Sequence, residues 1–190
     1  MGVFQRLFGK KAPAQSSGAQ ARRASQLLDQ LVRIGSGAPS AGTMRELSTV
    51  MDRFTQLAQD TRDPAVVEVL LGALNHQNPG VRGLAIQSLG LVYDPRALDA
   101  LAQLYPTLGG DHRQRAAASI ANLVLNRDKN PKGIAALKVI ARDKSLPIEV
   151  RAHAVMALCG FRRTNAEAEG FLTELANDPS EEVALKVAAM

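Results

Sequence analysis

The chain has 190 residues, of which 46% are hydrophobic, and carries a net charge of +5. Its length suits one domain or a short repeat array, and its apolar runs are too short to span a bilayer. The single cysteine, Cys159, excludes an internal disulfide and a cysteine-rich zinc site, so we expect a reducing, cytoplasmic setting. The basic N-terminus is not followed by the apolar stretch of a secretory signal, so we expect no such signal. Few aromatic residues and abundant Ala, Leu and Val favour packed helices over sheets.

The charges are unevenly distributed along the chain. Residues 1–23 hold five basic and no acidic side chains, whereas residues 24–112 hold six basic and nine acidic ones. Residues 113–163 hold eleven basic and three acidic side chains, and residues 164–190 hold one and six. This polarity predicts either an anion-binding segment or a solvated face.

Residues 1–20 are predicted to form a flexible basic tail that ends in a small, polar linker at 12–20. Apolar residues at i, i+3 and i+4 beside cations indicate a short amphipathic element for an anionic membrane surface or a partner. The residues of this element are Phe4, Arg6, Leu7, Phe8, Lys10 and Lys11. If the tail binds a membrane, the protein lies peripherally at its inner face; the alternative is a tail without a docking role.

Residues 21–60 are predicted to form a capping pair of helices at 21–34 and about 43–60, because apolar residues recur there with helical spacing. Thr43 is expected to cap the second helix, with Glu46 completing a capping box. This pair would cover the N-terminal end of a repeat array.

Residues 61–190 are predicted to form about four helix pairs. Asp or Asn followed by Pro marks a helix start. The Asp or Asn side chain accepts hydrogen bonds from the free backbone amides of the first turn. Proline suits the first helical position, because the N–H that it lacks would have no partner there anyway. The dipeptides are Asp63-Pro64, Asn78-Pro79, Asp94-Pro95, Asn130-Pro131 and Asp178-Pro179. The predicted pairs are 64–75 with 79–92, 95–108 with 111–126, 131–143 with 147–161, and 165–177 with 179–190.

The second helices align on Arg82, Arg113, Arg151 and Ala184, at intervals of 31, 38 and 33 residues. Such intervals are typical of helical repeats, whose pairs stack because none buries its apolar face alone. The structural repeat positions are Arg82, Ala85, Leu89, Ala116, Ile120, Ala154 and Leu158, with Val187 aligned to the alanines. The small residues that follow, Gly90, Ala121 and Cys159, would let neighbouring helices approach closely.

The segments NPGVRGLAIQSLG (78–90), LPIEVRAHAVMALCG (146–160) and GDHRQRAAASIANL (110–123) resemble HEAT-like repeats, in particular the short bacterial, phycobilisome-lyase-type form. The resemblance implies an all-α protein, an α-solenoid of stacked antiparallel helix pairs whose second helices line a concave face. Most members of that family bind proteins, and a minority modify tetrapyrrole-carrying proteins or bind nucleic acid.

Enzyme signatures such as Walker A, G-x-S-x-G and H-E-x-x-H motifs are absent. His76, His112 and His153 lie far apart in the repeat register, so we predict no metal site and no cofactor. We therefore predict a non-catalytic scaffold or adaptor for protein partners. A lyase-like enzyme accessory is an alternative.

Two interpretations of the recurring arginines stay open. Arg82, Arg113 and Arg151 either pair with Asp or Asn of a neighbouring turn, which we favour, or form a ladder that grips phosphates. Candidate anion- or partner-binding residues are Arg113, Arg115, Arg151, Arg162 and Arg163. Nucleic-acid binding is the less favoured alternative, since Phe161 is the one aromatic residue of 113–163 available for base stacking.

The last predicted helix is poorly covered by polar residues, although terminal repeats normally have a polar outer face. Val183, Val187 and Met190 either pack back on the preceding helix or form an interface for self-association or a partner.

Overall fold

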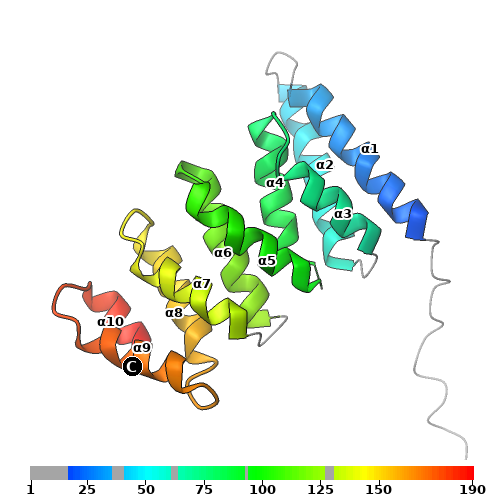
Figure 1. The fold of residues 1–190 in the computed structure, drawn as a ribbon. Helices are drawn as coiled ribbons and strands as arrows, with labels where there is room; N and C mark the ends of the chain where they lie inside the picture. The colour runs from blue at the N-terminus through cyan, green and yellow to red at the C-terminus, as the bar shows by residue number, and fades with distance from the viewer. Residues whose placement is uncertain (1–16, 36–40, 61–63, 93, 127–130) are drawn as a thin grey trace, which may run out of the picture.

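The computed structural model describes residues 17–35, 41–60, 64–92, 94–126 and 131–190, and helices without strands form the regular structure in these ranges. The α-helices are α1 (Ser17–Gly35), α2 (Ala41–Asp60), α3 (Pro64–Ala73), α4 (Pro79–Leu89), α5 (Pro95–Leu104), α6 (Gly110–Asn126), α7 (Pro131–Arg142), α8 (Ile148–Cys159), α9 (Ala166–Asn177) and α10 (Val183–Ala189), with a 3-10 turn, η1 (Tyr105–Thr107), after α5. The predicted all-α solenoid of antiparallel pairs is confirmed (Figure 1).

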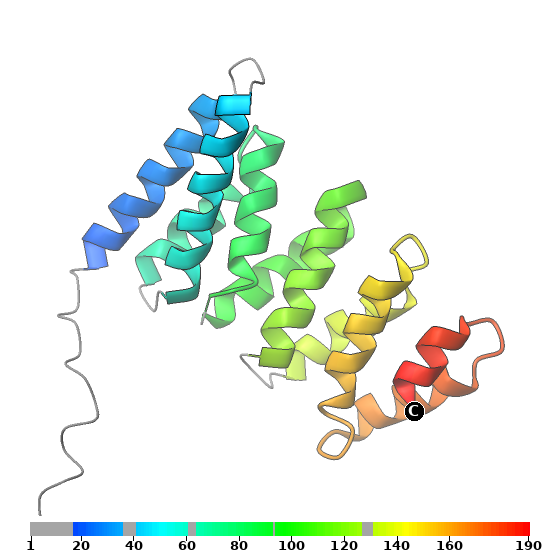
Figure 2. The same ribbon diagram turned by 180° about the vertical axis from the view of Figure 1, so that it is seen from behind.

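The helices form two layers. The first helices of the pairs, α1, α3, α5, α7 and α9, form one layer, and the second helices, α2, α4, α6, α8 and α10, run side by side in the other (Figure 2). Each second helix contacts the second helix of the next pair, so the core runs continuously between the layers.

Asp or Asn before Pro caps two of the helices as predicted. The Asn78 side chain accepts hydrogen bonds from the backbone amides of Gly80 (2.8 Å) and Val81 (3.4 Å) at the start of α4. The Asp94 side chain accepts one from the amide of Arg96 (2.9 Å) at the start of α5. Asp63 and Asn130 lie outside the described residues.

The first two helices begin earlier than predicted. Helix α1 starts at Ser17, so residues 17–20 are helical where a linker was expected. Helix α2 starts at Ala41, which places Thr43 inside the helix and not at its cap. Small residues such as Ala and Ser were interpreted as a loop, yet they fit a first helical turn. The remaining tail, residues 1–16, lies outside the described residues.

The last helix begins later than predicted, at Val183 and not at Pro179. The Asp178 carboxylate accepts from the amide (2.8 Å) and the hydroxyl (2.7 Å) of Ser180, which closes a turn in place of a helix start. This turn carries Glu181 into the protein, where it is buried.

The register of α10 also differs from the sequence alignment. Val187, aligned with the buried Ala154, is 59% exposed. The buried residues of α10 are Leu185 and Ala189, which match Ala154 and Leu158 in α8. The last helix is therefore shifted by two residues relative to the alignment, because the turn before it replaces the expected first helical turn.

Small residues permit the close approach between second helices. The aliphatic repeat positions Ala85, Leu89, Ala116, Ile120, Ala154 and Leu158 are fully buried. At the end of α4, a Cβ atom on Gly90 would lie 2.8 Å from Cα of Ser119 in α6. Since that neighbour is backbone, no side-chain movement relieves the clash, and the α4–α6 spacing depends on glycine at this position.

We expect Gly90→Ala to lower the free energy of unfolding by about 1–3 kcal/mol, because it overpacks the α4–α6 contact. The matched control is Gly72→Ala in α3, where an added Cβ meets no heavy atom within 4 Å. Alanine there should be neutral or stabilising by up to about 1 kcal/mol, since it favours helix over glycine. Urea unfolding of both variants checks the prediction, and equal effects would contradict it.

Candidate functional site: the second-helix face

Arg151, near the start of α8, is engaged entirely inside the protein. Its side chain is 2% exposed, and its Nε donates to the Ala141 carbonyl (2.9 Å) at the end of α7. Its Nη2 lies 2.5 Å from Oε2 of Glu181, itself 2% exposed, and its Nη1 lies 3.3 Å from Oε1 of Glu182. Arg151 is therefore poorly placed for the external anion site proposed from the sequence, because its buried guanidinium already bonds the Ala141 carbonyl of its own pair and the two glutamates before α10.

Arg113, near the start of α6, makes a comparable set of contacts. Its Nε donates to Oδ2 of Asp143 (2.7 Å) in the next pair, and its Nη1 donates to the Leu108 carbonyl (3.4 Å). Its guanidinium lies 4.9 Å from the ring centre of Tyr105, whose hydroxyl donates to the same carboxylate. Burial would raise the pKa of Asp143, but hydrogen bonds from Ser145, Tyr105 and Arg113 outweigh it and lower the pKa to about 2.

Arg82, in α4, contacts carbonyls alone. Its Nη1 donates to the carbonyls of His76 (2.8 Å) and Gln77 (3.1 Å) in the preceding turn. The three arginines thus share a bond to a carbonyl at the end of the first helix or in the turn of their own pair. Arg113 and Arg151 also donate a hydrogen bond to a carboxylate that lies 30 residues later in the chain, in the following helix pair. For Arg82 the corresponding turn, residues 105–109, contains no carboxylate.

The cations of the first-helix layer are paired as well. The ion pairs between successive first helices are Arg96 with Glu68, Lys132 with Asp99 (3.3 Å), Lys138 with Glu167 (2.8 Å), and Arg142 with Glu174 (2.6 Å). Basic residues of 113–163 therefore pair largely with acids of the repeats before and after. The segregation of charge along the sequence arises because the partners of each pair lie about one repeat apart.

The remaining candidate cations lie at the surface or near the C-terminus. Arg162 donates to the carbonyls of Ala189 (3.3 Å) and Met190 at the end of α10. Arg115 and Arg163 are exposed and make no ion pair within the described ranges. The five predicted cations thus do not form one patch, since two are tied into inter-repeat pairs and one caps a helix end.

The outward side of the second-helix layer changes from polar to apolar along the array. In α2 the exposed side chains include Arg45, Glu46, Thr49, Asp52 and Arg53. In α6, α8 and α10 small and apolar residues gather on the solvent-facing side, with the half-buried Asn122, His153 and Lys186 as polar neighbours. We call these the apolar second-helix face: Ala118, Leu125, Ala152, Met156, Cys159, Val183, Val187 and Met190.

Large side chains dominate this face towards the C-terminus. Met156 is 53% exposed, and Val183 and Met190 are each 74% exposed. The interpretation in which Val183, Val187 and Met190 pack back on the preceding helix is wrong, because Leu185 and Ala189 occupy the buried side of α10. Exposed apolar areas are common where proteins bind partners. The sequence indicates exposed apolar residues at the end of α10 as one of two interpretations, but it does not predict the exposure of Met156. That exposure depends on which side of α8 faces the core.

Cys159 belongs to this face but is poorly suited to nucleophilic chemistry. Burial raises the pKa of its thiol, opposed by the nearby charge of Arg162. Its Sγ lies 3.3 Å from the Ala188 carbonyl, in the contact between α8 and α10. The thiol therefore acts as a small packing group, as its place in the repeat indicated.

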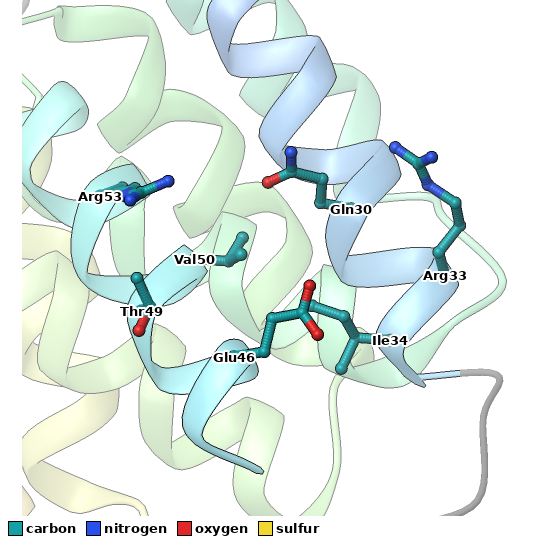
Figure 3. Close-up of a pocket in the computed structure, with 7 residues that line it drawn as sticks. All are labelled: Gln30, Arg33, Ile34, Glu46, Thr49, Val50 and Arg53. Atoms are coloured by element: carbon teal, nitrogen blue, oxygen red, sulfur yellow. The ribbon is translucent and has the colours of Figure 1, made fainter. Parts of the chain in front are cut away.

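A cleft of about 620 Å³ lies between α1 and α2 at the opposite end of the array. Gln30 and Glu46 reach into the space between the helices, whereas the guanidinium of Arg33 points away from it (Figure 3). The charged residues around this cleft have both signs and do not converge, so it does not resemble a concentrated ligand site.

Within the described ranges, no group of three His, Cys, Asp or Glu side chains could hold a metal ion. His76 accepts from the Asn78 amide (3.0 Å), and His112 lies against the Pro79 carbonyl (2.9 Å), so both contact backbone. No described helix combines the length and apolar character needed to cross a bilayer.

Comparison with known proteins gives a family match and similar structures. Residues 54–121 match the model of the family described as HEAT repeats. The solved complex of CpcE and CpcF of phycocyanin lyase from Nostoc sp. PCC7120 aligns with a TM-score of 0.59 at 21% identity, covering 87% of this chain and 99% of that one. The crystal structure of an engineered protein aligns with a TM-score of 0.41 at 17% identity, covering 93% and 90%. None of the curated proteins matches significantly.

We expect Arg151→Met to lower the free energy of unfolding by about 3–5 kcal/mol, because it leaves Glu181 buried without its cation. The double variant R151M/E181M should recover much of that loss, since it removes both charges. Arg163→Met is the exposed control and should change stability by no more than about 0.5 kcal/mol. Urea unfolding measures all three, and an R151M effect as small as that of R163M would contradict the buried pairing.

Proposed function

We propose that this chain, which carries HEAT repeats, is a non-catalytic scaffold that binds a protein partner through the apolar second-helix face. The observation that carries the proposal is the exposure of Met156, Val183, Val187 and Met190 on adjacent helices of one layer. Hydrophobic side chains of this size each contribute about 1.5–3 kcal/mol when a partner buries them fully.

The distribution of charge supports the same proposal. Ion pairs between repeats engage most of the described cations of residues 113–163, so apolar burial is the main source of binding energy on this surface. The polar side chains of α2 lie at the other end of the layer and would fix the orientation of a long partner. A central apolar area with a polar border is the usual anatomy of a protein interface.

The alternative of a lyase-like enzyme accessory rests on the fold likeness to the CpcE–CpcF complex of phycocyanin lyase. An enzyme site would need convergent polar groups in a pocket. The polar side chains beside the apolar second-helix face, Asn122, His153 and Lys186, come from three different helices, and the exposed large side chains there are apolar, which favours docking over chemistry. That the similar structure is itself a complex of two proteins also fits a role in assembly.

The nucleic-acid alternative has weaker support, because most of the cations on which it depended contact carboxylates or carbonyls. Phosphate binding would have to break the pairs of Arg113, Lys138 and Arg142. Arg115 and Arg163 remain exposed, but they lie on different elements and do not form a stripe along the surface.

We expect Val187→Glu to abolish retention of the partner, because it places a charge among the exposed apolar side chains of α10. The matched control is Val139→Glu on the first-helix layer, where Val139 is 57% exposed, close to the value for Val187. Full-length protein and both variants are used to capture proteins from a native lysate, and the retained proteins are compared. A partner lost from V187E and kept by V139E supports the proposal, whereas equal retention by both contradicts it.

Sedimentation analysis of the same variants identifies the case in which the occupant is a second copy of this chain. Wild type and V139E would then sediment as dimers and V187E as a monomer. A monomeric wild type assigns the face to a different protein.

We also propose that the basic tail tethers the scaffold to an anionic surface. The tail combines Phe4, Leu7 and Phe8 with Arg6, Lys10 and Lys11, and paired apolar and cationic groups bind anionic lipid.

We expect deletion of residues 1–16, which leaves α1 intact, to remove most co-sedimentation with phosphatidylserine vesicles at low salt. Neutral phosphatidylcholine vesicles should retain neither form, because the apolar face of so short a segment binds weakly without charge attraction. Equal binding of full-length and shortened protein to the anionic vesicles would contradict the proposed role of the tail as a tether.

A further inference from the structure

A groove continues the apolar second-helix face towards the N-terminal ends of α4 and α6. One hollow of about 380 Å³ lies between α1, α4 and α6, and its apolar residues include Leu31, Val81 and Leu84. A smaller hollow of about 230 Å³ lies between α6 and α8. The two hollows share Asp111 and Arg115, and the smaller one is also lined by Ala118 of the apolar second-helix face.

The larger hollow exists because α4 carries glycine where it faces α6. A Cβ on Gly83 would lie 3.6 Å from Nε2 of His112 and 3.8 Å from Cδ of Arg115. Both side chains therefore lie next to a position of α4 that carries no side chain. The contact between His112 and the Pro79 carbonyl fixes the first turn of α6 across the start of α4. The walls of the hollow are therefore held by the packing of the array.

Arg115 is the cation that lines both hollows of this groove, together with the carboxylate of Asp111. It is exposed and makes no ion pair within the described part of the chain, unlike Arg113 two residues earlier. Asp111 lies in the first turn of α6, where the free amides and the helix dipole stabilise its carboxylate. The helix start stabilises the Asp111 carboxylate where it is, and Arg115 stands at the junction of the two hollows without a salt bridge to it.

Resting on the proposed function, we infer that this groove binds a segment of the protein partner that carries a large apolar side chain next to an Asp or Glu side chain. The apolar side chain fills the hollow between α1, α4 and α6, and the carboxylate pairs with Arg115. An apolar anchor in a preformed pocket beside a charged hydrogen bond is a recurrent source of interface affinity and specificity.

Selection of random peptides displayed on phage against the immobilised full-length protein tests the inference. Wild type should enrich peptides in which a large apolar residue stands close to Asp or Glu. Arg115→Glu should reverse the preference to Lys or Arg at that place. Arg163→Glu changes another exposed arginine that makes no ion pair within the described residues, in the turn between α8 and α9, and should keep the acidic preference. A peptide selected on wild type should bind R115E at least tenfold more weakly and R163E within about twofold.

The outcomes separate this inference from the proposed function. Enriched peptides that are apolar, lose binding in V187E and show no acidic preference overturn the inference and leave the proposed function standing. Peptides that compete for the groove but bind wild type and R115E equally also overturn it. If wild type enriches no peptide at all, the inference is rejected, and the proposed function is decided separately by the capture experiment with V187E and V139E. Circular dichroism of R115E and R163E verifies that these surface changes leave the helices intact.

Discussion

The last three helix pairs of the structure are held together by arginine–carboxylate pairs between successive repeats. Arg151 reaches Glu181 and Arg113 reaches Asp143, in both cases 30 residues along the chain and across one repeat boundary. A buried pair of this kind contributes little net stability compared with an apolar contact, but breaking it is costly, so it fixes how neighbouring repeats sit. The same pairing explains why basic residues concentrate in one segment and acidic residues in the next.

Once these charges are paired internally, the surface that remains for binding is mainly apolar. The second helices α6, α8 and α10 present Met156, Val187 and Met190 to solvent, whereas the first-helix layer is lined with ion pairs. Arg115 is the exception, an exposed cation beside the apolar hollow between α1, α4 and α6. The proposed docking face therefore uses the surface that the repeat architecture leaves unpaired, whereas the described arginines of the repeat motif bond neighbouring turns and helices.

The sequence predicts those features that depend on local chemistry. Capping by Asn78 and Asp94 and the need for a small residue at Gly90 follow from hydrogen bonding and size at single positions. The start of α10 could not be predicted in this way, because its turn is set by Glu181 entering the core to meet Arg151, a contact between distant residues. The charge of each segment does not show which cations are free for the same reason, because the sum over a segment does not reveal ion pairs between repeats. Met156 was missed because an outward methionine and a core methionine look alike in a helical pattern.

Hydrogen–deuterium exchange of the full chain, alone and with a captured protein partner, tests the docking face most directly. Amide exchange is slowed where a partner covers or stabilises a helix, and the short α10 should be among the least protected helices of the free chain. We expect the partner to slow exchange in α8 and α10, with smaller effects in α6 and at the start of α4. Protection confined to α3, α5 and α7 would show that the ion-paired layer binds the partner and would contradict the account.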